Sequence, residues 1–259
     1  RDYDRLRRAF SGIDIVIHAA ALKQVLAAEA DPFEAVMTNI MGAKNVIDAA
    51  IDTGVSRILA LSTDKAVGPA NLYGGTKFVA EKLFVQGNAY STSDTTFACS
   101  RYGNVIGSRG SVIPLFKRQR ENGSLTITDD RMTRFWITLD QGVDFVIKCF
   151  EMMSGGEIFV PKLPVMKIMD LAKAVAPNNK IKVTGIRPGE KIHEEMISVN
   201  EARTTFEYDD FYCIMPAYYS WTVEPPPGGI KTPNDFVYSS ETAEQAVSDQ
   251  ELKEIIEQL

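Results

Sequence analysis

The sequence predicts an α/β fold in which a doubly wound parallel sheet is followed by a smaller C-terminal region. Short β-branched and apolar runs alternate over residues 13–101 with longer segments of helical apolar spacing. The 259 residues are 45% hydrophobic and 24% charged, so the chain can bury a large core. This alternation requires right-handed crossovers, with helices on both faces of the sheet and ligands at the carboxyl ends of the strands.

Five elements are expected in the first hundred residues. Residues 13–17 form a β-branched run typical of a strand that is buried on both faces. Asp31 and Pro32 form a good helix start, because a carboxylate caps the helix and proline suits its first turn. The expected order is strand 13–17, helix 32–52, strand 57–62, helix 73–88 and strand 96–101.

The second half of the chain is less regular. From about residue 111 short helices and strands are separated by glycine, proline and charged residues, so we place a soft boundary near residue 110. Residues 111–259 are expected to form mainly a substrate-binding region, with some elements returning to the core. The segment 214–240 is expected to wrap the surface before a last helix near 248–258.

Charge and cysteine content exclude several classes of function. The formal net charge of −6 argues against a general affinity for nucleic acid or for an anionic membrane surface. No run of about 18 apolar residues predicts a membrane span. Cys99, Cys149 and Cys213 lack CxxC spacing, so we expect neither a metal site nor a disulfide framework. These features favour a cytoplasmic protein.

The start of the sequence suggests a fragment. Residues 1–6 have the composition of a helix, and the chain begins without an initiator methionine. A dinucleotide-binding sheet of this type needs a first strand and a glycine-rich turn, and the sequence contains no GxGxxG. We therefore expect about 60 residues, roughly two βα units, to precede the strand at 13–17.

The central motif joins a strand end to a helix start. Ser62-Thr63-Asp64-Lys65 ends one predicted strand, and Tyr73 and Lys77 lie four residues apart on the next helix, so they share one face. A neighbouring ammonium favours the phenolate of a tyrosine, and Lys77 can supply that charge. Tyr73 and Lys77 alone could equally be an ordinary amphipathic pair.

Six motifs give the chain a specific resemblance. It resembles the extended short-chain dehydrogenase/reductase family, and within it the inverting UDP-N-acetylglucosamine 4,6-dehydratases of the polysaccharide biosynthesis type, which act in pseudaminic acid synthesis for flagellin glycosylation. The motifs are His18-Ala-Ala-Ala-Leu-Lys23, Thr38-Asn-Ile-Met-Gly42, Ser62-Thr-Asp-Lys65, Arg101-Tyr-Gly-Asn104, Thr133-Arg-Phe-Trp136 and Arg187-Pro-Gly-Glu-Lys191.

The resemblance implies a catalytic role for each residue of the central motif. Tyr73, supported by Lys77, would handle the carbon 4 hydroxyl of the sugar, while Thr63 would hydrogen-bond the reacting oxygen. Lys65 would take the carbon 5 proton, and Asp64 would protonate the departing carbon 6 hydroxyl. These roles need a buried site that favours the neutral forms of both groups. The alternative is that Asp64 and Lys65 form a solvated ion pair in a loop.

The resemblance also implies ligand-binding residues. It makes residues 1–110 a Rossmann-like core that binds NADP, with NAD less favoured, and UDP-N-acetylglucosamine the substrate. Homo-oligomers are usual in the family. The expected cofactor-binding residues are Ala19, Ala20, Ala21, Lys23, Asn39, Ser62, Tyr73, Lys77 and Arg101. The expected substrate-binding residues are Asn104, Arg134, Arg187 and Glu190, with Arg187 at the diphosphate and Glu190 at the ribose hydroxyls.

Two other functions stay open from the sequence. A UDP-sugar 4-epimerase needs Tyr73 and Lys77 but has no use for Asp64 and Lys65. A non-catalytic nucleotide-sugar-binding scaffold could keep the fold without the glycine-rich turn. Large membrane-anchored dehydratases share the Asp-Lys pair but typically have methionine in place of Tyr73, so Tyr73 favours the short type.

Overall fold

The computed structural model describes residues 1–91, 94–108, 111–221, 223–243, 246–247, 252 and 256. The chain folds into two compact units. The first unit comprises Arg1–Tyr102, Val143–Lys162 and Met196–Val237. The second unit comprises Gly103–Gly142, Leu163–Glu195 and Tyr238–Leu259.

A seven-stranded sheet organises the first unit, in the order β1-β2-β3-β7-β12-β11-β13. The first four strands in this order, β1, β2, β3 and β7, run parallel to one another. The last three strands, β12, β11 and β13, join the sheet by antiparallel pairing. The doubly wound parallel sheet predicted from the sequence is therefore confirmed. Its strands are β1 (Ile15–His18), β2 (Arg57–Thr63), β3 (Thr96–Tyr102), β7 (Ile158–Pro161), β11 (Thr205–Glu207), β12 (Phe211–Ile214) and β13 (Ile230–Lys231).

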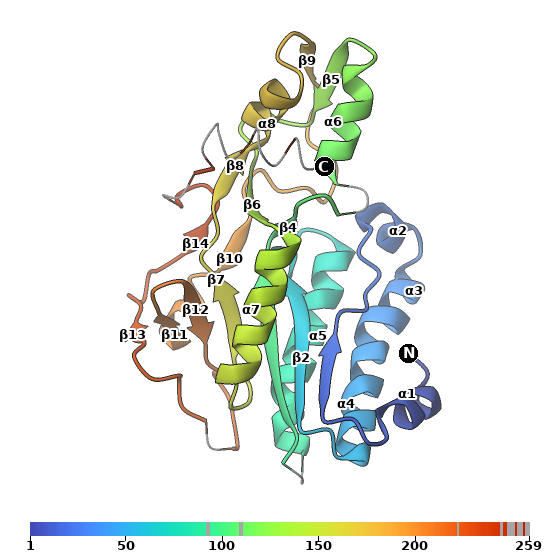
Figure 1. Ribbon diagram of the computed structural model, residues 1–259, viewed down its shortest axis with the longest axis vertical. Coiled ribbons are helices and arrows are strands. Elements are labelled where there is room, and N and C mark those ends of the chain that lie inside the picture. The colour runs from blue at the N-terminus through green and yellow to red at the C-terminus, as the bar shows by residue number, and fades with distance from the viewer. Residues whose placement is uncertain are drawn as a thin grey trace. The chain divides into compact units, whose positions relative to one another are not determined.

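Helices cover both faces of this sheet (Figure 1). On one face α7 (Leu139–Met152) buries Cys149 against Leu59 and Ala98. On the other face α5 (Leu72–Tyr90) places Phe84 against the ring of Phe97, and α4 (Gly42–Thr53) packs beside α5. Adjacent strand residues such as Phe97 and Ala98 point to opposite faces, so a strand covered on both faces is apolar throughout. The remaining helices of this unit are α1 (Tyr3–Phe10), α2 (Val25–Ala30) and α3 (Pro32–Val36), with 3₁₀ turns at Asp64–Ala66 and Ala202–Thr204.

The helix predicted at 32–52 is present but is interrupted by a π-helical segment, Met37–Met41, between α3 and α4. Asp31 caps its start by accepting a hydrogen bond from the Glu34 backbone N–H, and Gly54 ends it in the left-handed conformation. A π-helical segment inserts an extra residue into the turn and often marks a functional site. Here the segment carries Asn39.

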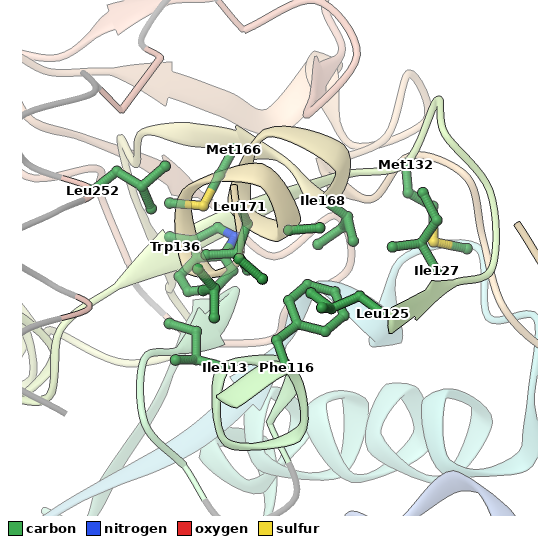
Figure 2. Close-up of a cluster of buried hydrophobic side chains, with 13 residues drawn as sticks. Ile113, Phe116, Leu125, Ile127, Met132, Trp136, Met166, Ile168, Leu171 and Leu252 are labelled. Atoms are coloured by element: carbon green, nitrogen blue, oxygen red, sulfur yellow. The ribbon is translucent and has the colours of Figure 1, made fainter. Parts of the chain in front are cut away.

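The second unit has a core of its own. Three strands, β4 (Asn104–Val105), β6 (Thr133–Ile137) and β8 (Val165–Lys167), form one small sheet, and β5 (Ser124–Ile127) pairs with β9 (Lys180–Val183). Figure 2 shows apolar side chains from α6 (Val112–Arg120), these strands and α8 (Ile168–Val175) meeting in one buried cluster. Trp136 lies in this cluster with 3% of its surface exposed, so it is a core residue.

The C-terminal segment runs over the surface as expected, since nearly all described residues from 217 to 237 are exposed or half-buried. Within residues 214–240, β13 joins the edge of the large sheet. β14 (Tyr238–Ser239) pairs with β10 (Glu195–Ile197) in a separate two-stranded sheet. Most of the helix predicted near 248–258 lies outside the described residues. Across the described ranges, no helix has both the length and the apolar character needed to cross a membrane.

Candidate active site

The carboxyl end of β2 leads directly into the 3₁₀ turn Asp64–Ala66. The Thr63 hydroxyl donates to Oδ1 of Asp64 at 2.8 Å, and the Lys65 ammonium donates to the same oxygen at 3.0 Å. Asp64 is completely buried, while a quarter of the Lys65 side chain is exposed. The second carboxyl oxygen of Asp64, Oδ2, is buried and has no partner among the described residues. It is therefore free to hold a proton or to meet a ligand hydroxyl.

Tyr73 and Lys77 lie on one face of the first turns of α5, as predicted. Asn71 caps this helix by accepting from the Gly74 backbone N–H at 2.8 Å. Both side chains are buried, and the Lys77 ammonium donates to the carbonyl oxygen of Leu61 at 2.7 Å. The helix start thus holds Tyr73 and Lys77 beside the end of β2.

The charge of Lys65 favours the Tyr73 phenolate. Burial raises the pKa of Tyr73, Lys65 opposes that rise most strongly, and Asp64 adds to it. Burial lowers the pKa of Lys77 itself, with Glu81 acting in the opposite direction. Lys65 therefore contributes to the electrostatic field at Tyr73, and the supporting role of Lys77 stays a prediction.

Asn39 links the loop after β1 to the start of α5. Its side chain accepts from the Leu22 N–H at 2.7 Å and donates to the Leu22 carbonyl at 3.0 Å. It also donates to the Thr76 hydroxyl at 2.9 Å, which in turn donates to the Tyr73 carbonyl at 2.8 Å. Asn39 and Thr76 are each 1% exposed. Asn39 therefore holds the backbone near Tyr73, and Thr76, which no motif singled out, completes this link.

His18, at the end of β1, is held neutral by its surroundings. Burial lowers its pKa to about 4 and the charge of Lys77 acts in the same direction, while its ring packs on Phe84 at 5.2 Å. Because the folded pKa lies below the unfolded value of about 6.5, the unfolded state binds more protons between these pH values. Stability from this residue is present above pH 6.5 and is lost as the pH falls toward 4.

We expect the replacement His18→Phe, which keeps a ring against Phe84, to remove this pH dependence. Urea unfolding at pH 7.5 and pH 4.5 should show that the wild-type protein loses about 2 to 3 kcal/mol more than the variant. Equal losses in the two proteins would mean that His18 titrates normally in the folded state.

Small and polar side chains lie at the carboxyl ends of β1 and β2, where cofactor-binding residues were predicted. Ala19 and Ala20 are small and exposed, Ala21 is half-buried, and Lys23 is exposed. The Ser62 hydroxyl is buried without a partner among the described residues, so a ligand could satisfy it. Together with Lys77, these residues remain predicted cofactor-binding residues.

Arg101 does not belong to that site. Its guanidinium makes five hydrogen bonds, two to Glu81, two to Glu201 and one to the Met196 carbonyl. A guanidinium has five N–H donors, so none is left for a ligand. The side chain is only 1% exposed. We correct its expected role from cofactor binding to structural ion pairing inside the first unit.

Two predicted substrate residues share a turn in the second unit. Arg187 is exposed, and its guanidinium contacts the Glu190 carboxylate at 3.4 Å. Gly189 between them has a φ of 79°, which favours glycine. On β4 of the same unit, Oδ1 of Asn104 is buried with no partner among the described residues. Arg187, Glu190 and Asn104 thus all keep polar groups that a ligand could use.

Arg134, the fourth predicted substrate residue, binds the chain itself. Its guanidinium donates to the carbonyls of Thr133, Ile192 and Lys191 at 2.7, 2.9 and 2.9 Å. Nε also lies 3.7 Å from the Glu194 carboxylate. We therefore correct its expected role: Arg134 holds the backbone that follows the Arg187–Glu190 turn. His193 is likewise structural, since Nδ1 lies 2.8 Å from the Thr133 hydroxyl.

The described residues hold no cluster of three or more histidine, cysteine, aspartate or glutamate side chains that could bind a metal ion. Buried Tyr73 and Lys77 lie beside Asp64 and Lys65 at the carboxyl end of a parallel strand, and this arrangement resembles the catalytic centre of short-chain dehydrogenases/reductases. A family model described as polysaccharide biosynthesis protein matches residues 1–216, and the chain belongs to this family.

Three known proteins show how far the similarity extends. The inverting UDP-N-acetylglucosamine 4,6-dehydratase of Campylobacter jejuni strain 81-176 is 50% identical, with 99% of this chain and 80% of the relative covered. A UDP-glucose 4-epimerase of Rickettsia massiliae is 44% identical, with 83% of this chain and 64% of the relative covered. The X-ray structure of Pen from Bacillus thuringiensis has a TM-score of 0.88 and 38% identity, with 99% of this chain and 79% of that chain covered.

Proposed function

We propose that the protein is an inverting UDP-N-acetylglucosamine 4,6-dehydratase, a hydro-lyase that uses NADP. The observation that carries the proposal is the buried Asp64 carboxyl, bonded to Lys65 and placed beside Tyr73. Oxidation at carbon 4 needs only the Tyr-Lys pair, whereas elimination of water needs an acid and a base of its own. The similarity to the Campylobacter dehydratase supports the same reaction.

Tyr73 acts first in the proposed mechanism. Its phenolate, favoured by the Lys65 charge, accepts the proton of the carbon 4 hydroxyl while the carbon 4 hydrogen leaves as hydride. The nicotinamide, when bound, would accept that hydride and later return it to carbon 6, while carbon 5 would take up a proton from groups that exchange with solvent. The new carbonyl at carbon 4 makes the carbon 5 proton acidic, and Lys65 would remove it.

Asp64 and Lys65 can exchange one proton along their hydrogen bond of 3.0 Å. This transfer converts the ammonium-carboxylate pair into an amine and a carboxylic acid without a proton from solvent. The amine then takes the carbon 5 proton, and the acid gives its proton to the carbon 6 hydroxyl, which leaves as water. The ion pair is thereby restored.

We assign substrate recognition to the second unit and cofactor recognition to the first. Arg187 would pair with the diphosphate, Glu190 with the ribose hydroxyls and Asn104 with a phosphate oxygen. Ala19 to Ala21, Lys23, Asn39, Ser62, Tyr73 and Lys77 would hold or position the cofactor. The choice of NADP over NAD, a homo-oligomeric assembly and a cytoplasmic role in pseudaminic acid synthesis are parts of the proposal that rest on the resemblance.

A UDP-sugar 4-epimerase is the alternative, and the 44% identity to the Rickettsia protein supports it. An epimerase would oxidise and reduce carbon 4 with Tyr73 and Lys77 and would leave carbon 6 untouched. The protein should therefore be incubated with UDP-N-acetylglucosamine and catalytic NADP, and the product followed by mass spectrometry. Loss of one water supports the dehydratase, and an unchanged mass with a galacto-configured sugar supports the epimerase. Binding without conversion would favour a non-catalytic scaffold.

A further inference from the structure

Gly74, next to Tyr73 on α5, lies directly against the backbone of Lys65. A Cβ added to this residue would lie 2.2 Å from the carbonyl oxygen of Lys65 and 3.1 Å from Cβ of Pro69. Real Cβ atoms essentially never come closer than 3.0 Å to such neighbours. The backbone of Gly74 is helical, so glycine is needed here for close approach and not for an unusual φ.

The next residue, Gly75, provides a matched comparison. It belongs to the same turn of α5, yet a Cβ there would meet nothing within 4 Å. Alanine in an open helical position usually stabilises a protein relative to glycine. Of the two glycines, only Gly74 is packed against the Asp64–Ala66 turn and Pro69.

Neither side of the contact at Gly74 can move freely. On the helix side, the Gly74 N–H is bonded to Asn71, and the Tyr73 carbonyl accepts from Thr76. On the other side, the Lys65 N–H is bonded to the Thr63 hydroxyl at 3.4 Å. The atom that a Cβ at position 74 would meet is the backbone carbonyl oxygen of Lys65. A side chain at position 74 must therefore push the first turn of α5 and the Asp64–Ala66 turn apart.

We propose that Gly74 is a positioning residue that sets the separation between Tyr73 and the Asp64-Lys65 pair, so that oxidation and elimination act on one bound sugar. The inference rests on the proposed dehydratase function. A shift of about 1 Å can lower a rate about 10²-fold. Tyr73 and Lys77 share one helix and move together, so a side chain at position 74 slows elimination more than carbon 4 oxidation.

The test compares Gly74→Ala and Gly75→Ala with the wild-type protein. For Gly75→Ala we expect kcat within about twofold of wild type and an equal or higher melting temperature. For Gly74→Ala we expect kcat for water loss to fall about 10²-fold, with KM for the UDP-sugar within a few-fold and a lower melting temperature. In a single turnover, absorbance of reduced nicotinamide should accumulate in Gly74→Ala and not in Gly75→Ala.

The rates are measured at a temperature where circular dichroism shows both variants folded, so a stability loss does not mimic a catalytic one. Equal kcat values in the two variants would overturn the role of Gly74. If folded Gly74→Ala lost oxidation and elimination equally, the inference that Gly74 acts mainly on elimination would be overturned. Failure of the wild-type protein to release water would instead reject the proposed function, so the two failures are distinguishable.

Discussion

Replacing Lys65 by methionine is expected to lower the rate of water loss by about 10² to 10⁴, the range that a general base contributes. Methionine keeps much of the length of the side chain but removes the amine that would take the carbon 5 proton. It also removes the charge that favours the Tyr73 phenolate, so carbon 4 oxidation should slow as well, though less. The measurement is kcat for formation of the 4-keto, 6-methyl sugar, with UDP-sugar affinity followed by calorimetry.

Lys82→Met is the matched control for this replacement. Lys82 is an exposed lysine on α5, and its ammonium lies over the ring of Phe78. Turnover of the control should stay within about twofold of wild type, since surface charges change little. UDP-sugar affinity should stay within a few-fold in both variants. Unchanged turnover of Lys65→Met would remove Lys65 as the base and move the assignment toward the epimerase.

Replacing Arg101 by methionine is expected to lower the free energy of unfolding by about 3 to 5 kcal/mol. The variant would leave the carboxylates of Glu81 and Glu201 without their cation, and the Glu81 side chain is completely buried. Unpaired buried charge is far more destabilising than loss of the pair itself. Urea unfolding at pH 7.5 measures the effect.

Two comparisons separate this cause from simple loss of packing. Arg203→Met changes an exposed arginine near Glu201 and should alter stability by less than about 0.5 kcal/mol. Combining Arg101→Met with Glu81→Gln and Glu201→Gln removes the uncompensated charges and should recover part of the loss. A single-variant loss below about 1 kcal/mol would show that the cluster is solvated in the folded protein.

The catalytic turn and the parallel strands were predictable because their signals are local. Tyr73 and Lys77 are one helical turn apart, and Asp64 and Lys65 follow the end of a strand, so spacing alone brings them to one sheet edge. The strands from β1 to β3 begin and end within two residues of the predicted bounds. Short apolar runs bounded by turns predict such strands well.

The roles of Arg101 and Arg134 could not be predicted, because their partners lie far away in the sequence. Arg101 pairs with residues 20 and 100 positions away, and Arg134 with carbonyls 57 and 58 positions away. A motif identifies an arginine but does not show whether its donors are already used. The π-helical segment was missed for another reason, since five residues are too few for apolar spacing to separate it from an α-helix.

The central claim is that Asp64 and Lys65 add an elimination to the carbon 4 chemistry of Tyr73 and Lys77. It is tested most directly by running the reaction with UDP-N-acetylglucosamine in D₂O and examining the product by proton NMR and mass spectrometry. We predict loss of one water, a methyl group at carbon 6, and deuterium at carbon 5 with inverted configuration. A product that keeps its oxygen at carbon 6 and carries no deuterium at carbon 5 would contradict the account.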